Sequence, residues 1–125
     1  FDLAKIELRE GQRDQAIERL DAILKKKPGH LGAATTRAGL ALQDKNPGLA
    51  EKVLVQAFES NQESARAGLI LTSYFQKTGQ PLKALRIARE VTSRHPKNIR
   101  GQRALASALS ATNDLNGATQ AYRKV

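Results

Sequence analysis

Small and apolar residues recur along this chain with a period of 34 residues, without insertion or deletion. The clearest column is alanine, at Ala16, Ala50, Ala84 and Ala118. A second column holds small residues, at Ala4, Ala38, Thr72 and Ala106. A third, apolar column consists of Ile23, Ala57, Val91 and Val125. Three columns in register over the whole chain indicate that one supersecondary unit is repeated and stacked.

Between these columns the apolar positions follow the spacing of an amphipathic helix. In one segment they fall at i, i+3, i+4, i+7 and i+8, namely Ala50, Val53, Leu54, Ala57 and Phe58. The pattern predicts eight helices, at about 1–10, 14–27, 31–44, 47–59, 65–77, 81–94, 99–111 and 115–125. We therefore expect an all-α chain of antiparallel helix pairs, in which small residues at the crossings let the axes approach closely.

Turn residues mark the junction inside each pair. Gly11 and Gly79 stand where a residue without Cβ adopts the left-handed conformation at low steric cost. Lys45 and Asn113 occupy the matching turns, so we expect strain at Lys45.

Other residues mark helix starts and ends. Asp14, Asn46 and Ser64 are expected N-caps, because their side-chain oxygens accept hydrogen bonds from the first free N–H groups of a helix. Pro28 and Pro96 close the second helix of a pair, since proline cannot continue it.

Together the small-residue columns, the turn glycines and the closing prolines resemble the tetratricopeptide repeat (TPR) family. Two departures from the family pattern are Arg37, where leucine is usual, and Gln62, which replaces a closing proline. The resemblance implies a right-handed α-α superhelix, a TPR solenoid of about 3.5 repeats. The chain would form one array cut from a longer protein, with repeats at 1–30 (partial), 31–64, 65–98 and 99–125 (truncated).

TPR proteins generally bind partners in the concave groove lined by the first helix of each pair. By this resemblance Gly32 and Gly39 would form an open floor of the groove. The implied binding residues are Lys5, Arg9, Thr35, Arg66, Ser73, Lys77, Arg100, Arg103 and Ser107. The two-carboxylate clamp of chaperone-binding members is not expected, because only Lys5 and Arg66 are cationic at the matching positions.

Charge is distributed unevenly between the two halves of the chain. Residues 1–64 hold ten basic and ten acidic side chains, whereas residues 65–125 hold eleven basic and two acidic ones. The whole formal net charge of +9 therefore falls in the second half, which suggests an anionic partner.

The nature of that partner stays open between three hypotheses. Arg66, Arg100 and Arg103 favour an acidic peptide or protein segment in the groove. An anionic polymer, either an exopolysaccharide or a nucleic acid, could instead lie along the outer residues Lys83, Arg86 and Arg89. The scarcity of aromatic residues argues against nucleic acid. In the third hypothesis the segment is a passive spacer in a longer superhelix.

Catalysis and cofactor binding are not expected. The chain has no cysteine, and His30 and His95 lie in turns between repeats with no neighbour at metal-ligand spacing. No glycine-rich phosphate loop is present, and the apolar runs are too short to span a bilayer. We expect end-to-end self-association through the uncapped ends of the array, where Leu105 and Leu109 would be exposed.

The richness in alanine and leucine with degenerate repeats is similar to bacterial TPR proteins. The lipoproteins of exopolysaccharide and exosortase (PEP-CTERM) loci are the subfamily that the composition resembles. This resemblance implies a periplasmic or membrane-associated location rather than a cytoplasmic one.

Overall fold

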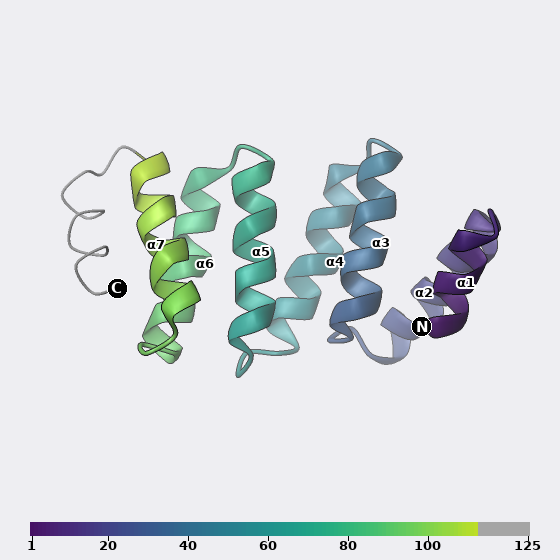
Figure 1. Cartoon of the computed structure of the whole chain (residues 1–125), viewed down its shortest axis with the longest axis horizontal. Helices are drawn as coiled ribbons and strands as arrows, with labels where there is room; N and C mark the ends of the chain where they lie inside the picture. Colours follow the sequence, from purple (N-terminus) through teal and green to yellow (C-terminus); the bar gives the residue numbers. More distant parts are fainter. Residues whose placement is uncertain (113–125) are drawn as a thin grey trace. The chain divides into compact units, whose positions relative to one another are not determined.

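The computed structural model describes residues 1–112, and within this range every regular element is an α-helix (Figure 1). The seven helices are α1 (Asp2–Arg9), α2 (Arg13–Lys26), α3 (Leu31–Gln43), α4 (Pro47–Glu59), α5 (Ala65–Lys77), α6 (Pro81–Arg94) and α7 (Ile99–Ala111). Their bounds agree with the predicted segments to within about two residues. The eighth predicted helix, with Ala118 and Val125 of the repeated columns, lies outside the described residues.

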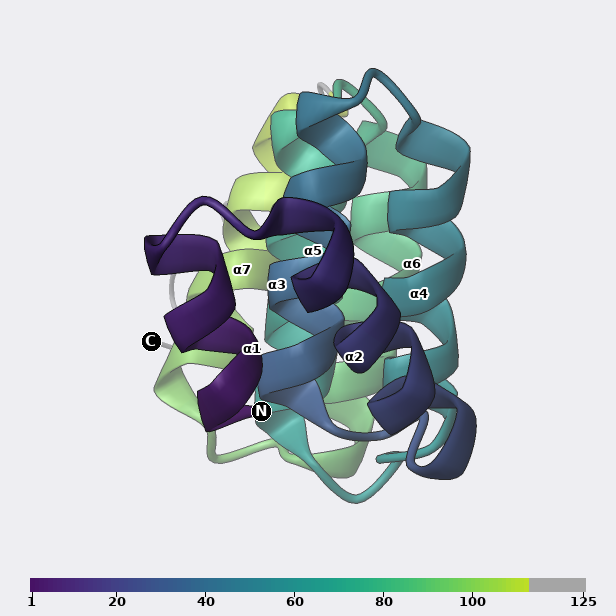
Figure 2. The same cartoon turned by 90° about the vertical axis from the view of Figure 1, so that its right-hand side faces the viewer.

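The helices group into two compact units, which are described separately. The first comprises Phe1–Asn61 with α1 to α4, and the second begins at Gln62 and contains α5 to α7. In the first unit α1 lies beside α2 and α3 beside α4 in two perpendicular views (Figures 1 and 2). In the second unit α6 packs against both α5 and α7. Within each unit the consecutive described helices run antiparallel, as the repeat predicts (Figure 1).

The repeated small residues form the helix crossings in the core of each unit. In the first unit Ala4, Ala16, Ala38 and Ala50 are buried. In the second unit the matching positions hold Ala84 and Ala106, both without exposed surface, and Thr72. The Thr72 hydroxyl donates to the Gly68 carbonyl at 2.8 Å, so its polar group is satisfied in the core. Close crossings of this kind require side chains no larger than these.

The turns inside the pairs repeat one geometry. Gly11 (φ +80°), Lys45 (φ +58°) and Gly79 (φ +71°) all adopt the left-handed conformation. In each turn the next N–H donates five residues back, from Gln12 to Glu7, from Asn46 to Ala41 and from Gln80 to Phe75, at 2.7 to 2.8 Å. This is the Schellman helix end, which satisfies the last carbonyls of the helix. The strain predicted at Lys45 is confirmed as a positive φ at a residue with a Cβ.

The N-caps follow the predictions with one exception. The side chains of Asn46 and Ser64 accept from the backbone N–H three residues ahead, as expected. The prediction that Asp14 caps α2 is wrong. That helix begins at Arg13 after Gln12, which forms no capping bond, and Asp14 lies in the first turn. There its negative charge still interacts favourably with the positive end of the helix dipole.

Two apolar residues lie differently from the sequence-based expectation. Leu109, expected at an exposed end, is only 5% exposed, and Leu105 is half-buried. On α1, Ile6 is 45% exposed, and Leu3 one turn earlier is 48% exposed. Both lie on a face of α1 turned away from the buried Ala4. The exposed apolar stripe of the first unit is therefore on α1.

Candidate functional site

The first helices of the two pairs in the second unit, α5 and α7, lie side by side and begin at the same end of the unit (Figure 1). The Gln76 side chain on α5 donates to the Ser107 hydroxyl on α7 at 3.2 Å and links the two helices. Arg66 and Arg100 hold equivalent positions, the second residue of α5 and of α7. We call the exposed surface formed by Arg66, Lys77, Arg100, Arg103 and Ser107 the α5/α7 face.

Three arginines on the α5/α7 face have guanidinium groups without a partner among the described residues. Arg66, Arg100 and Arg103 are exposed, and none forms a hydrogen bond or an ion pair with another described residue. The first turns of α5 and α7 contain no acidic residue. A cation beside the positive end of a helix dipole is unfavourable by about 0.3–1 kcal/mol at such exposed positions. The arrangement therefore favours an anion from outside the helices.

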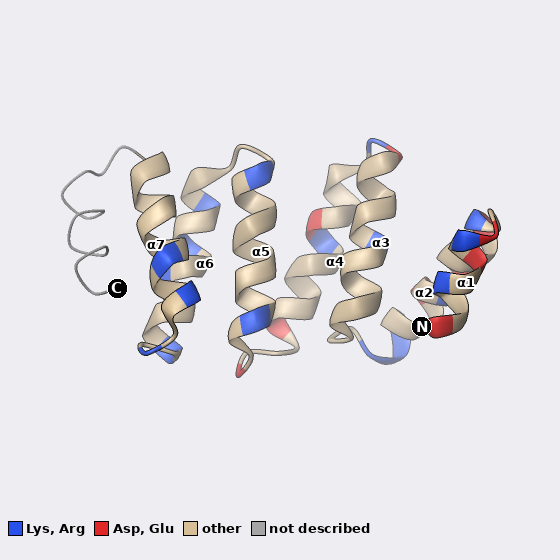
Figure 3. Cartoon of the chain, viewed as in Figure 1, with Lys and Arg blue, Asp and Glu red and all other residues tan. Residues whose placement is uncertain are grey.

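The surroundings of the α5/α7 face add to its positive potential (Figure 3). Residues 62–112 contain nine lysines and arginines but only two carboxylates, Glu63 and Glu90. Figure 3 shows blue at both ends of α5, on the first half of α7 and on α6. Fields from several like charges add, so the positive potential of this surface extends into the solvent over a distance comparable with the Debye length.

The remaining candidate groove residues lie elsewhere or are already engaged. Ser73 is partly buried on α5. Lys5, Arg9 and Thr35 belong to the first unit, where the Lys5 ammonium lies 4.7 Å from the centre of the Phe1 ring. The Thr35 hydroxyl donates to the carbonyl oxygens of its own helix, so it offers little hydrogen-bonding capacity to a ligand.

The predicted glycine floor is only partly open. A Cβ at Gly39 would meet nothing within 4 Å. A Cβ at Gly32 would approach the Phe1 ring to 2.8 Å, because that ring packs against the start of α3. The prediction of open space at Gly32 is therefore wrong.

Both histidines lie at helix ends. His30 caps α3, with Nδ1 accepting from the Ala33 N–H at 3.0 Å. His95 follows α6 and is half-buried, and its Nε2 is buried without a hydrogen-bond partner among the described residues. Within residues 1–112 no group of three or more His, Cys, Asp and Glu side chains could hold a metal ion.

Ion pairs in the first unit are structural contacts that the sequence did not reveal. Glu7 is buried in α1, and its carboxylate accepts from Arg19 Nε at 2.6 Å. This hydrogen bond raises the pKa of Arg19 above its usual value. Arg13 reaches from the first turn of α2 to the end of α3, where it donates to the Leu40 carbonyl and to Asp44. The Arg13 contacts join the two helix pairs of the first unit, whereas the Glu7–Arg19 ion pair links α1 to α2 within one pair.

Antiparallel helix pairs repeated every 34 residues define a helical-repeat protein, a class whose members present extended binding surfaces. The sequence profile described as "Tetratricopeptide repeat" matches residues 7–73, which is more than half of the chain. The chain belongs to the tetratricopeptide repeat family. The family and the all-α TPR fold predicted from the sequence are confirmed.

Solved structures of similar fold agree with this assignment. The structure titled MamA AMB-1 superposes with a TM-score of 0.72 at 20% identity, covering 98% of this chain and 67% of that one. A double mutant of MamA RS-1 gives 0.71 at 21% identity, covering 98% of this chain and 69% of that one. At such identity the likeness shows the fold alone. Comparison with curated proteins finds no match.

Proposed function

We propose that this protein is a non-enzymatic interaction scaffold that binds an acidic peptide or protein segment on the α5/α7 face. The observation that carries the proposal is the pair Arg66 and Arg100. Both are exposed, both lack a partner among the described residues, and both stand at equivalent positions where two neighbouring helices begin.

Arginine suits this role because its planar guanidinium forms two parallel hydrogen bonds to one carboxylate. Neighbouring packed helices lie about 10 Å apart. An extended peptide advances about 3.3 Å per residue, so two carboxylates about three residues apart would reach the two arginines together. Arg103, one turn after Arg100, would favour further negative charge.

The test is charge reversal with a matched control. The variant Arg66→Glu/Arg100→Glu changes the α5/α7 face, whereas Arg86→Glu/Arg89→Glu changes two exposed arginines of α6 and lowers the net charge by the same amount. The probe is a fluorescein-labelled peptide with two glutamates three residues apart, and anisotropy measures its affinity. We expect at least about tenfold weaker binding for R66E/R100E and a change below about threefold for R86E/R89E.

An anionic polymer is the second candidate, favoured by the excess of basic residues in 62–112. A polymer bound by the general field would lose affinity equally in both variants, and its binding would fall steeply with salt. Alginate is a suitable probe of the polysaccharide class. Nucleic acid is disfavoured because Phe58, Tyr74 and Phe75 are buried and offer no stacking surface. If neither variant changes any binding, the passive-spacer hypothesis is favoured.

The kinship with lipoproteins of exopolysaccharide and exosortase loci stays a prediction, as does the periplasmic or membrane-associated location that it implies. None of the helices within residues 1–112 combines the length and the apolar character needed to cross a bilayer.

A further inference from the structure

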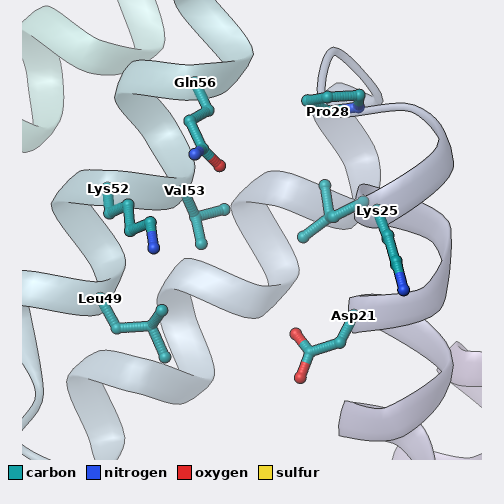
Figure 4. A pocket seen from close by; sticks show the side chains of 8 residues that line it. Asp21, Lys25, Pro28, Leu49, Lys52, Val53 and Gln56 are labelled. Atoms are coloured by element: carbon teal, nitrogen blue, oxygen red, sulfur yellow. The ribbon is translucent and has the colours of Figure 1, made fainter.

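The second helices of the two pairs in the first unit, α2 and α4, border a cleft that the proposed function does not use (Figure 4). Its volume is about 210 Å³. The lining residues are Asp21, Leu24, Lys25 and Pro28 on one side and Leu49, Lys52, Val53 and Gln56 on the other. We propose that this cleft is a second docking site, which takes an apolar side chain and a neighbouring carboxylate of a peptide segment from a protein partner.

The cleft is large enough for one side chain but smaller than a typical small-molecule or cofactor pocket. Pockets for small-molecule ligands measure about 300–1,000 Å³. A cavity of about 150 Å³ suffices for benzene, so the cleft has room for one aromatic or branched side chain. Its lining is mixed, and Leu24, Leu49 and Val53 form the apolar part that such a side chain would contact. Burying an apolar anchor there would provide the hydrophobic part of the binding free energy.

The cleft continues into a second hollow, which gives the rest of a peptide a path. This hollow shares Leu24, Lys25, Pro28 and Gln56 with the cleft and adds Glu59 and Ser60. An extended chain anchored in the cleft can therefore run along the surface between α2 and α4 within the same unit.

The rim of the cleft carries uncompensated positive charge. Lys25 and Lys52 are exposed, and neither forms an ion pair or a hydrogen bond through its side chain with another described residue. Asp21 also lines the cleft, but Arg37 Nε donates to its carboxylate at 2.9 Å and balances its charge. Figure 4 shows Lys52 and Val53 on α4 opposite Lys25 and Asp21 on α2. Two such ammonium groups beside Leu24, Leu49 and Val53 complement a peptide in which an apolar residue adjoins an acidic one.

The peptide probe for the test is first selected by its binding to the whole chain. The immobilised protein is panned against a phage library of random 12-residue peptides, and enriched peptides are synthesised with a fluorescent label. We expect an enriched pattern of one large apolar residue within two positions of Asp or Glu. Anisotropy should show about tenfold weaker binding to Lys25→Glu/Lys52→Glu.

Matched variants locate the bound peptide. Lys26→Glu/Lys27→Glu alters two exposed lysines that do not line the cleft, with the same change in net charge, and should bind within about threefold of the parent. Gln56→Trp puts a large side chain on an exposed position of the cleft wall and should also weaken binding. Circular dichroism verifies that each variant keeps its helices.

Three outcomes overturn the proposal. The first is the absence of an enriched apolar–acidic pattern. The second is an equal loss of affinity in K25E/K52E and K26E/K27E, which would mean binding by general charge. The third is a loss in R66E/R100E with none in K25E/K52E, which would place the peptides on the α5/α7 face and leave the function proposed for that face intact.

Discussion

Arg37 is the residue at which the chain departs most from its own repeat. The equivalent position one repeat later holds Leu71, which is 1% exposed. Arg37 is 9% exposed, its Nε donates to Asp21, and its Nη1 is buried without a hydrogen-bond partner. The buried Arg37 guanidinium loses hydration that its attraction to the exposed Asp21 carboxylate repays only in part, so apolar replacement of a buried charge is often neutral or stabilising.

The two members of this pair should therefore respond oppositely to substitution. Arg37→Leu restores the repeat residue and leaves Asp21, whose side chain is 56% exposed, in water, so we expect a gain of about 1 kcal/mol in the free energy of unfolding. Asp21→Ala leaves a buried guanidinium without its partner and should cost about 2 kcal/mol. Urea unfolding followed by circular dichroism measures both. A loss of stability in R37L as large as that in D21A would contradict this account.

The sequence marked Arg37 as an exception but did not predict its partner. Asp21 lies 16 residues earlier on another helix, and nothing in its local pattern distinguishes it from the other exposed acids of α2. The pairing arises only when α2 packs against α3. The same reason explains why Gln76 was missed as the partner of Ser107.

At the scale of elements, the Schellman ends of α1, α3 and α5 are the feature most completely predicted from sequence. The period places positions 11, 45 and 79 in equivalent turns, and all three have positive φ. Gly11 and Gly79 occupy two of these positions. A Cβ there would meet no atom within 4 Å, so the positive φ alone favours glycine. Lys45 adopts the same conformation with a Cβ present, which is unfavourable by about 1 kcal/mol.

Exchanging residues between these turns should shift stability in opposite directions. We expect Lys45→Gly to raise the free energy of unfolding by about 0.5–1 kcal/mol, because it removes the left-handed strain. Gly79→Ala should lower it by about 1 kcal/mol for the same reason. Thermal unfolding of the two variants provides the comparison. Destabilisation by K45G would show that the lysine side chain contributes more than the turn geometry indicates.

At the scale of the molecule, surface properties are unevenly distributed between the units. The described second unit holds the excess of basic residues, whereas the first unit exposes Leu3 and Ile6 three residues apart on α1. Residues three apart on a helix are neighbours on its surface, so these two form a continuous apolar stripe. Exposed apolar stripes of this kind favour association between copies.

We therefore expect the protein to associate weakly at high concentration through α1. Leu3→Glu/Ile6→Glu should reduce the concentration dependence of the mass measured by light scattering, because it places charges on the stripe. The control Leu82→Glu/Ile99→Glu changes two residues that are more exposed, at 74% and 55%, but lie in the first turns of separate helices. Its mass should match that of the parent. A parent that stays monomeric at every concentration would count against this association.

Local pattern alone was sufficient for the class of fold and most helix bounds, since periodicity, turn residues and caps act within a few residues of each other. The sequence also located the basic half of the chain, because net charge is a sum over residues and does not depend on the fold. The tertiary structure decided which side chains contact one another and which surfaces they leave open. The Arg37–Asp21 pair, the Phe1 ring over Gly32 and the cleft between α2 and α4 all depend on packing between helices. The repeat constrains the positions of helix crossings, but it does not determine the contacts of residues that differ from one repeat to the next.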